Sequence, residues 1–154
     1  MRQWKLWMRR VREEDGSSSL EFITMGLLLL VPLVYLTLAV ASIQGAALAV
    51  EGAARQAARV YVQAPTTADA DARAERAVDF ALADYGLDSG QAQISVSCAP
   101  DPDHCLTRTG AVTVTVQVRA PLPLVPSVLD LQQTASVPLQ ATGTQTVSRF
   151  WSGQ

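Results

Sequence analysis

One run of residues sets the architecture of this chain, and it reads Gly16-Ser17-Ser18-Ser19-Leu20-Glu21-Phe22 before continuing through Ile23-Thr24-Met25-Gly26-Leu27-Leu28-Leu29-Leu30 as far as Ile43. From Phe22 to Ile43 there are 22 residues without a charge, most of them apolar. As a helix they would extend about 33 Å, which is enough to cross the hydrocarbon core of a membrane. The run therefore predicts an anchored or exported protein. Its upstream edge is unusual, because the acid Glu21 directly precedes it.

Charge is distributed unevenly around this run. Five basic residues precede it, opposed by three acids, whereas the chain after Gly16 holds seven arginines, eleven acids and no lysine. Short basic flanks stay in the cytoplasm, so we expect a single-pass protein of the cytoplasmic membrane, with its N-terminus inside and everything after Ile43 outside. A nucleic-acid role is disfavoured, because the outer part is acidic and binding to phosphates needs a basic surface.

The first helix is expected to run from Phe22 to Val62, since the sequence beyond the apolar run is rich in alanine and lacks proline. Pro32 should bend it, and Glu51 and Arg55 are spaced to form an ion pair. A stripe of small residues, each four apart, follows this helix: Ala41, Gly45, Ala49, Ala53 and Ala57. Such a stripe lets another helix approach closely, although alanine is also abundant here and is the best helix former.

The rest of the chain predicts a small α+β domain. Residues 64–67 break the first helix, and apolar spacing over Asp69–Tyr85 predicts a short amphipathic helix capped by Gly86. Strict alternation of apolar and polar residues predicts strands at Ala92–Cys98 and Val112–Val118. These elements suggest one small antiparallel sheet.

A third strand is expected from Thr134 to Val147, and Pro138 should make it an edge or bulged strand. The proline-rich connection Pro121–Pro126 is not expected to be helix or central strand. For the exposed aromatic pair Phe150-Trp151 we favour packing back on the sheet over contact with a partner.

Two cysteines, Cys98 and Cys105, fall in the part expected outside the cell, where an oxidising environment favours a disulfide. Between them lie Asp101, Asp103 and His104, which together with the cysteines would be possible metal ligands. The paired prolines of this segment and its location favour a plain disulfide turn, so we expect no metal site.

No catalytic constellation is recognisable. His104 is the only histidine, and the sequence contains no nucleophile elbow, P-loop or dinucleotide-binding motif. We therefore expect no enzyme activity, no cofactor and no small-molecule substrate. Glu21 is the functional candidate, because a carboxylate at the edge of a lipid-embedded helix is costly unless it finds a cation. A cut after Gly16 would create such a cation, the α-amine of Ser17, one helical turn away.

The run Gly16-Ser17-Ser18-Ser19-Leu20-Glu21-Phe22 resembles a class III, prepilin-type cleavage site. The segment Ala53-Ala54-Arg55-Gln56-Ala57-Ala58-Arg59 resembles the one that follows the membrane helix in TadE-like proteins of the tight-adherence (Flp-type) pilus system. Members of this family usually have a proline soon after the acid and often a second acid late in the helix. This chain departs from both features, because its proline, Pro32, comes late and Gln44 is uncharged.

The resemblance implies a minor pseudopilin or accessory subunit of a pilus assembly or secretion system, cut after Gly16 by a prepilin peptidase. Glu21 would be the fifth-position acid used in processing and assembly, beside Ser17 and Phe22. Residues 1–16 would be the leader, 17–63 the membrane helix with its extension, and 64–154 the outer domain. Partners would be the membrane, the peptidase, other pilin or pseudopilin subunits and membrane platform proteins.

Two other interpretations stay open. Ala39-Val40-Ala41 is a possible signal-peptidase site, and a cut after Ala41 would release a secreted domain. Against this, the apolar run is longer than a usual signal peptide core, and three acids stand shortly before it. The third interpretation is an uncleaved single-pass scaffold or binding protein.

Overall fold

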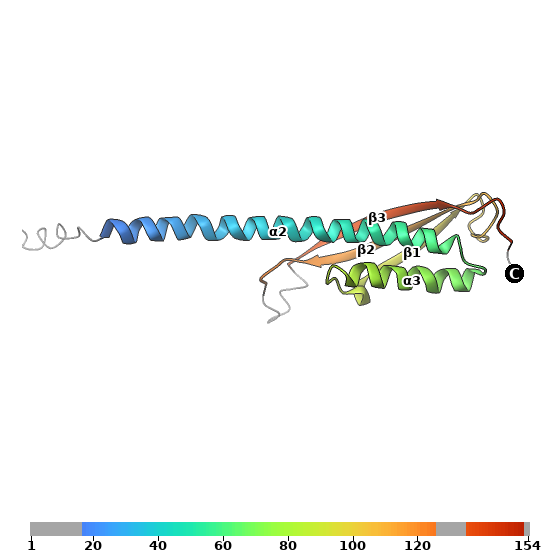
Figure 1. The fold of residues 1–154 in the computed structure, drawn as a ribbon, viewed down its shortest axis with the longest axis horizontal. Helices are drawn as coiled ribbons and strands as arrows, with labels where there is room; N and C mark the ends of the chain where they lie inside the picture. The colour runs from blue at the N-terminus through green and yellow to red at the C-terminus, as the bar shows by residue number, and fades with distance from the viewer. Residues whose placement is uncertain (1–16, 126–134, 153–154) are drawn as a thin grey trace, which may run out of the picture. The chain divides into compact units, whose positions relative to one another are not determined.

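The computed structural model describes residues 17–125 and 135–152. The predicted fold class is confirmed, since a long N-terminal helix and a second helix are followed by a three-stranded antiparallel sheet in a pilin-like α+β arrangement (Figure 1). The leader and the predicted start of the third strand at Thr134 lie outside the described residues. In chain order the elements are α2 (Ser17–Tyr61), α3 (Thr67–Ala83), the 3₁₀ helix η1 (Ser89–Gln91), β1 (Gln93–Ala99), β2 (Ala111–Pro121) and β3 (Ser136–Thr146).

The contacts divide the chain into two compact units, Met1–Ala39 and Val40–Gln154. The boundary falls inside α2, whereas the sequence suggested a division after residue 63. The second part of the helix is grouped with the sheet because its inner face is buried in the core of that unit.

In the first unit, the described side chains from Ser19 to Leu38 are all exposed. Among the described residues, α2 is the one helix that is long and apolar enough to cross a membrane. It continues through Pro32, which lies inside the helix. Exposed leucine and valine side chains at this density are stable in lipid and unfavourable in water, so this part of α2 has the properties of a membrane anchor.

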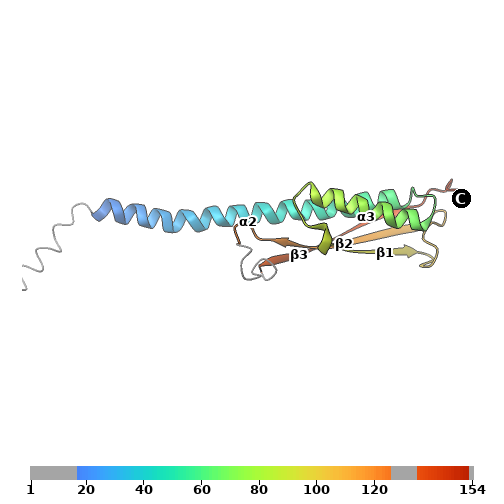
Figure 2. The same cartoon turned by 90° about the horizontal axis from the view of Figure 1, so that it is seen from below.

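The second unit has one hydrophobic core between a helical layer and a sheet. Figures 1 and 2 show α2 and α3 side by side on the same face of the sheet. Small side chains predominate on α2, which permits close packing, while β2 supplies valines. The principal core residues are Ala49, Val50, Ala53, Ala54, Ala57, Ala58 and Tyr61 of α2, Ala70, Ala74, Val78 and Leu82 of α3, and Val112, Val114, Val116 and Val118 of β2.

The sheet has the strand order β1-β2-β3, with both neighbouring pairs antiparallel. Its register aligns uncharged polar side chains into rows on the face away from the helices. The rows are Gln93–Gln117–Gln140, Ser95–Thr115–Thr142 and Ser97–Thr113–Thr144. The hydroxyl oxygens of Thr113 and Thr144 lie 3.0 Å apart, so these two side chains form a cross-strand hydrogen bond.

The prolines correct one prediction and confirm another. Pro121 ends β2, the central strand, although the sequence argued against a central strand there. This is possible because β1 pairs with β2 only as far as Gln117, so Pro121 has a neighbour on one side alone. Pro138 lies in β3, which is an edge strand as expected.

Helix α3 has Thr66 as its N-cap and Asp84 as its C-cap, so it ends two residues before the predicted Tyr85, and Gly86 follows the C-cap. The Thr66 hydroxyl accepts a hydrogen bond from the backbone N–H of Asp69 at 3.1 Å, as an N-cap residue does. Gly86 has a φ of 67°, and its N–H donates to the Ala83 carbonyl, which is the glycine termination expected after a helix. Tyr85, which the periodicity placed on the buried face, is 55% exposed.

Candidate functional site

Ser17, the first described residue and the one that follows the predicted cleavage position, lies in helix α2. Glu21 follows within the same helix, and a separation of four residues puts both positions on one helical face, about 6 Å apart along the axis. Gly16 lies outside the described residues. An amine created on Ser17 would therefore be within one turn of the Glu21 carboxylate.

Glu21 is exposed, and in the part of the chain that the structure describes it has no ion-pair partner. The next residue, Phe22, is 80% exposed and starts the uncharged run. Nearby, the Thr24 hydroxyl donates a hydrogen bond within the helix to the Leu20 carbonyl at 2.7 Å. Within the described residues, Glu21 thus presents an exposed carboxylate without an ion-pair partner, next to a surface that favours lipid.

The five small residues of the predicted packing stripe have different environments. Ala41 is exposed and Gly45 is half-buried, whereas Ala49, Ala53 and Ala57 are buried in the core of their own domain. Their small size lets the sheet approach α2. The closest approach is at Gly143 of β3, where an added Cβ would lie only 2.7 Å from the Cα of Arg55.

Sequence reasoning missed this pairing between helix and strand, because an alanine stripe has the same pattern whether it packs on a helix or on a sheet. The useful signal was a single glycine in a strand, which often marks the close approach of another backbone.

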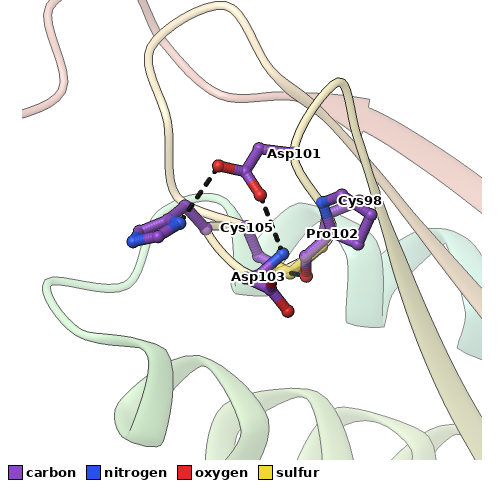
Figure 3. The surroundings of a disulfide bond; sticks show 6 residues. Cys98, Asp101, Pro102, Asp103 and Cys105 are labelled. Carbon is purple, nitrogen blue, oxygen red and sulfur yellow. Dashed lines mark hydrogen bonds and ion pairs between the residues drawn. A yellow bond between two sulfur atoms is a disulfide. The ribbon is translucent and has the colours of Figure 1, made fainter.

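The predicted disulfide joins Cys98 at the end of β1 to Cys105 in the following loop (Figure 3). In that loop, one carboxylate oxygen of Asp101 accepts a hydrogen bond from the Asp103 backbone N–H at 3.0 Å. The other lies 3.1 Å from Nδ1 of His104. These contacts are those of a polar turn, and no metal-binding group of three or more ligands occurs among the described residues.

A shallow groove of about 850 Å³ lies beside this loop, lined by Thr66, His104, Arg108 and Trp151 among others. Trp151 closes part of it, since its indole N–H donates to the Ala64 carbonyl at 3.0 Å and its own carbonyl accepts from Nε of Arg108 at 2.9 Å. The prediction that the C-terminal aromatics pack back is therefore right for Trp151. It is wrong for Phe150, which is 85% exposed.

Tyr61, the last residue of α2, was not singled out from the sequence. It is 3% exposed, and burial, together with the adjacent Asp71 carboxylate, raises its pKa to about 12. Both causes favour the protonated phenol, because ionisation would place a second negative charge beside Asp71 in a buried position. Tyr61 is a structural residue at the junction of α2 and α3.

Comparison with protein-family models, with curated proteins and with solved structures found no match to this chain.

Proposed function

We propose that this chain is a TadE-like minor pseudopilin or accessory subunit of a tight-adherence, type IV-like pilus assembly or secretion system. The observation that carries the proposal is that a single helix, α2, contains both an exposed apolar segment long enough to span a membrane and the helix of a sheet-packed domain. A prepilin-type cut after Gly16 would leave such a helix attached to the domain as its anchor.

In this role the chain is not an enzyme. Its N-terminus lies in the cytoplasm before cleavage, and the second unit lies outside, where an oxidising environment preserves the disulfide. The partners are the prepilin peptidase, other pilin or pseudopilin subunits and the membrane platform proteins of the system. The Glu21 carboxylate pairs with the new α-amine of Ser17, either in the same chain or in a neighbouring subunit.

The test is the N-terminal residue of the mature protein together with its membrane partitioning. We expect Ser17 as the first residue, in the membrane fraction. Met1 in the membrane fraction would instead identify an uncleaved anchor and would rule out processing.

One observation favours secretion as a second candidate. The compact second unit begins at Val40, so a cut after Ala41 would release that unit almost whole. The same measurement separates the two, because this cut would give Ser42 as the first residue, in the medium. That result would replace the pseudopilin proposal.

The role of Glu21 has its own test. Glu21→Ala should impair processing or assembly while membrane insertion stays normal, because the substitution removes a charge without shortening the apolar run. Glu51→Ala is the matched control, since Glu51 is an acid on the same helix that already pairs with Arg55. Wild-type levels of processed and assembled Glu21→Ala protein would remove the proposed role.

A further inference from the structure

A second groove lies on the outer surface of the second unit, where α2 and α3 meet. It has a volume of about 700 Å³ and its lining includes apolar side chains from both helices together with two arginines. We call it the α2–α3 groove and define it by Val60, Arg73, Arg76, Ala77, Phe80 and Ala81. Phe80 is 73% exposed, so a large aromatic side chain stands in water at the edge of this groove.

In the part of the chain that the structure describes, the two arginines of the α2–α3 groove have no carboxylate partner. Arg76 donates from Nε to the Ala72 carbonyl at 2.9 Å, and neither arginine forms an ion pair within residues 17–125 and 135–152. Asp84 also lines the groove, but it lies eight residues beyond Arg76, about 12 Å along the helix. The end of the groove near Arg73 and Arg76 therefore presents two guanidinium groups, with the exposed Asp69 one turn before Arg73 on the same helix.

The other flank of α3 carries an acidic ridge, formed by Asp71, Glu75 and Asp79. These acids are exposed and four residues apart, so each repels the next by about 0.2 to 0.5 kcal/mol in a helix. None of the three forms an ion pair with another described residue, and Asp71 alone has a side-chain neighbour, the hydroxyl of Tyr61. At 3.6 residues per turn, the ridge and the groove fall on opposite sides of the buried row that holds α3 on the core.

We propose that the α2–α3 groove binds the acidic ridge of a second copy of this chain. The charges are complementary, and the ridge covers about 12 Å of helix, which suits a groove between two helices. Because groove and ridge are different surfaces of one molecule, the contact is heterologous, and copies joined in this way form an open row unless the rotation closes it. The inference deepens the proposed function and rests on it, since anchored subunits stand side by side in one membrane.

The test is photocrosslinking of the full chain in membranes, with a benzophenone amino acid in place of Phe80. We expect a ladder of dimers, trimers and larger species, with the crosslink mapping to the segment around Asp71, Glu75 and Asp79 of a second copy. Reversing the ridge with Glu75→Arg and Asp79→Arg should abolish the ladder. Reversing the groove with Arg73→Glu and Arg76→Glu should abolish it as well.

The chain that carries all four reversals is the decisive variant. Both surfaces then change sign, so complementarity returns and the ladder should return with it, which a merely misfolded protein would not show. Asp88→Arg with Asp103→Arg is the matched control, because it makes the same change in charge at two exposed acids outside α3 and should leave the ladder unchanged.

The inference is overturned if no ladder forms, if it survives either single-surface reversal, if the four reversals fail to restore it, or if Phe80 crosslinks only to a different protein. The N-terminal residue is determined in the same samples. Ser17 without a ladder overturns this inference alone, whereas a charge-dependent ladder on a chain beginning with Met1 keeps it and overturns the proposed function.

Discussion

The two halves of helix α2 have opposite surfaces. In the first unit, bulky side chains such as Leu29 and Phe22 are 73% and 80% exposed. In the second unit, Ala53 and Ala57 are both fully buried, at 0% exposure. One helix therefore places its largest apolar side chains outward in one half and its smallest ones inward in the other.

This difference is the one that a membrane anchor and a packed domain require of a single helix. Lipid tails conform to any side chain, so the first half needs only hydrophobicity. The sheet is rigid and lies against the helix backbone, so the second half needs small volume at fixed positions. A charged side chain should therefore be costly in the first half and tolerated where the second half is exposed. A larger side chain should be costly only where the second half is buried.

The largest effect is expected from a charge in the first half. Leu33→Arg places a cation near the middle of the apolar run, which should cost about 2.5 to 3.5 kcal/mol of membrane insertion. We expect the protein to leave the membrane fraction on fractionation. Leu48→Arg is the matched control in the second half, where the leucine is 62% exposed, and it should partition like the wild type.

The next effect concerns packing in the second half. Gly143→Ala should destabilise the domain by about 3 kcal/mol, because the added Cβ would lie 2.5 Å from the carbonyl carbon of Ala54 and the backbone must shift. Guanidinium titration of the full chain in detergent micelles measures this. Gly52→Ala is the control, since nothing lies within 4 Å of its added Cβ, and it should stabilise the helix by about 0.5 to 1 kcal/mol. If Gly143→Ala and Gly52→Ala changed the free energy of unfolding equally, the close approach of Gly143 to the α2 backbone would not limit packing.

The disulfide should stabilise the second unit and leave the first unaffected. Replacing both Cys98 and Cys105 by serine removes a short loop closure and should cost about 2.5 kcal/mol in the free energy of unfolding. The same titration gives the loss. Membrane partitioning of this variant should equal that of the wild type, and a decrease would mean that the two units depend on each other.

The pH dependence of the free energy of unfolding tests the environment of Tyr61, the last residue of α2. Because the folded state raises the pKa of Tyr61 from 10.0 to about 12, its contribution to stability is fully present below pH 10 and is lost as the pH rises through about 12. From pH 9 to pH 11 we expect a loss of about 1 kcal/mol. Tyr61→Phe should flatten this dependence, and an unchanged slope would exclude Tyr61 as its source.

The smallest effect is expected on the exposed face of the second half. The carboxylate of Glu51 pairs with Arg55, and both side chains are largely solvated. Glu51→Gln should cost only about 0.2 to 0.5 kcal/mol, and the difference should vanish at 1 M salt. A double-mutant cycle with Arg55→Gln measures the pair, and a coupling well above this range would show that the pair is less solvated than its exposure indicates.

Most of the fold could be predicted from the sequence, because local patterns determine it. The period-2 valines of β2 and the caps Thr66 and Gly86 each specify their element without reference to the rest of the chain. Pro121 was misjudged because the cost of a proline depends on which neighbouring strand reaches it. That depends on the register of pairing and not on the segment itself.

The candidate site was predictable to a smaller extent. The spacing of Ser17 and Glu21 follows from a helix alone, and the disulfide follows from two cysteines in a segment that the charge distribution predicts to lie outside the cell. The burial of Ala49, Ala53 and Ala57 against their own sheet could not be foreseen, because it depends on contacts distant in the sequence. The arginines and the acids of α3 can be assigned to different sides of the helix only after its buried residues, Ala70, Ala74, Val78 and Leu82, are known.

The contact between Gly143 and the backbone at Ala54 also limits how this protein can evolve. A side chain at position 143 fits only if the backbone of α2 at Ala54 lies farther from β3. Residue 143 and the helix positions around Ala54 should therefore change together or stay fixed in related proteins. The lipid-facing residues carry no such restriction, and leucine, valine, isoleucine and phenylalanine should replace one another freely there. In an alignment of related chains, the more hydrophobic half of α2 should therefore be the more variable one.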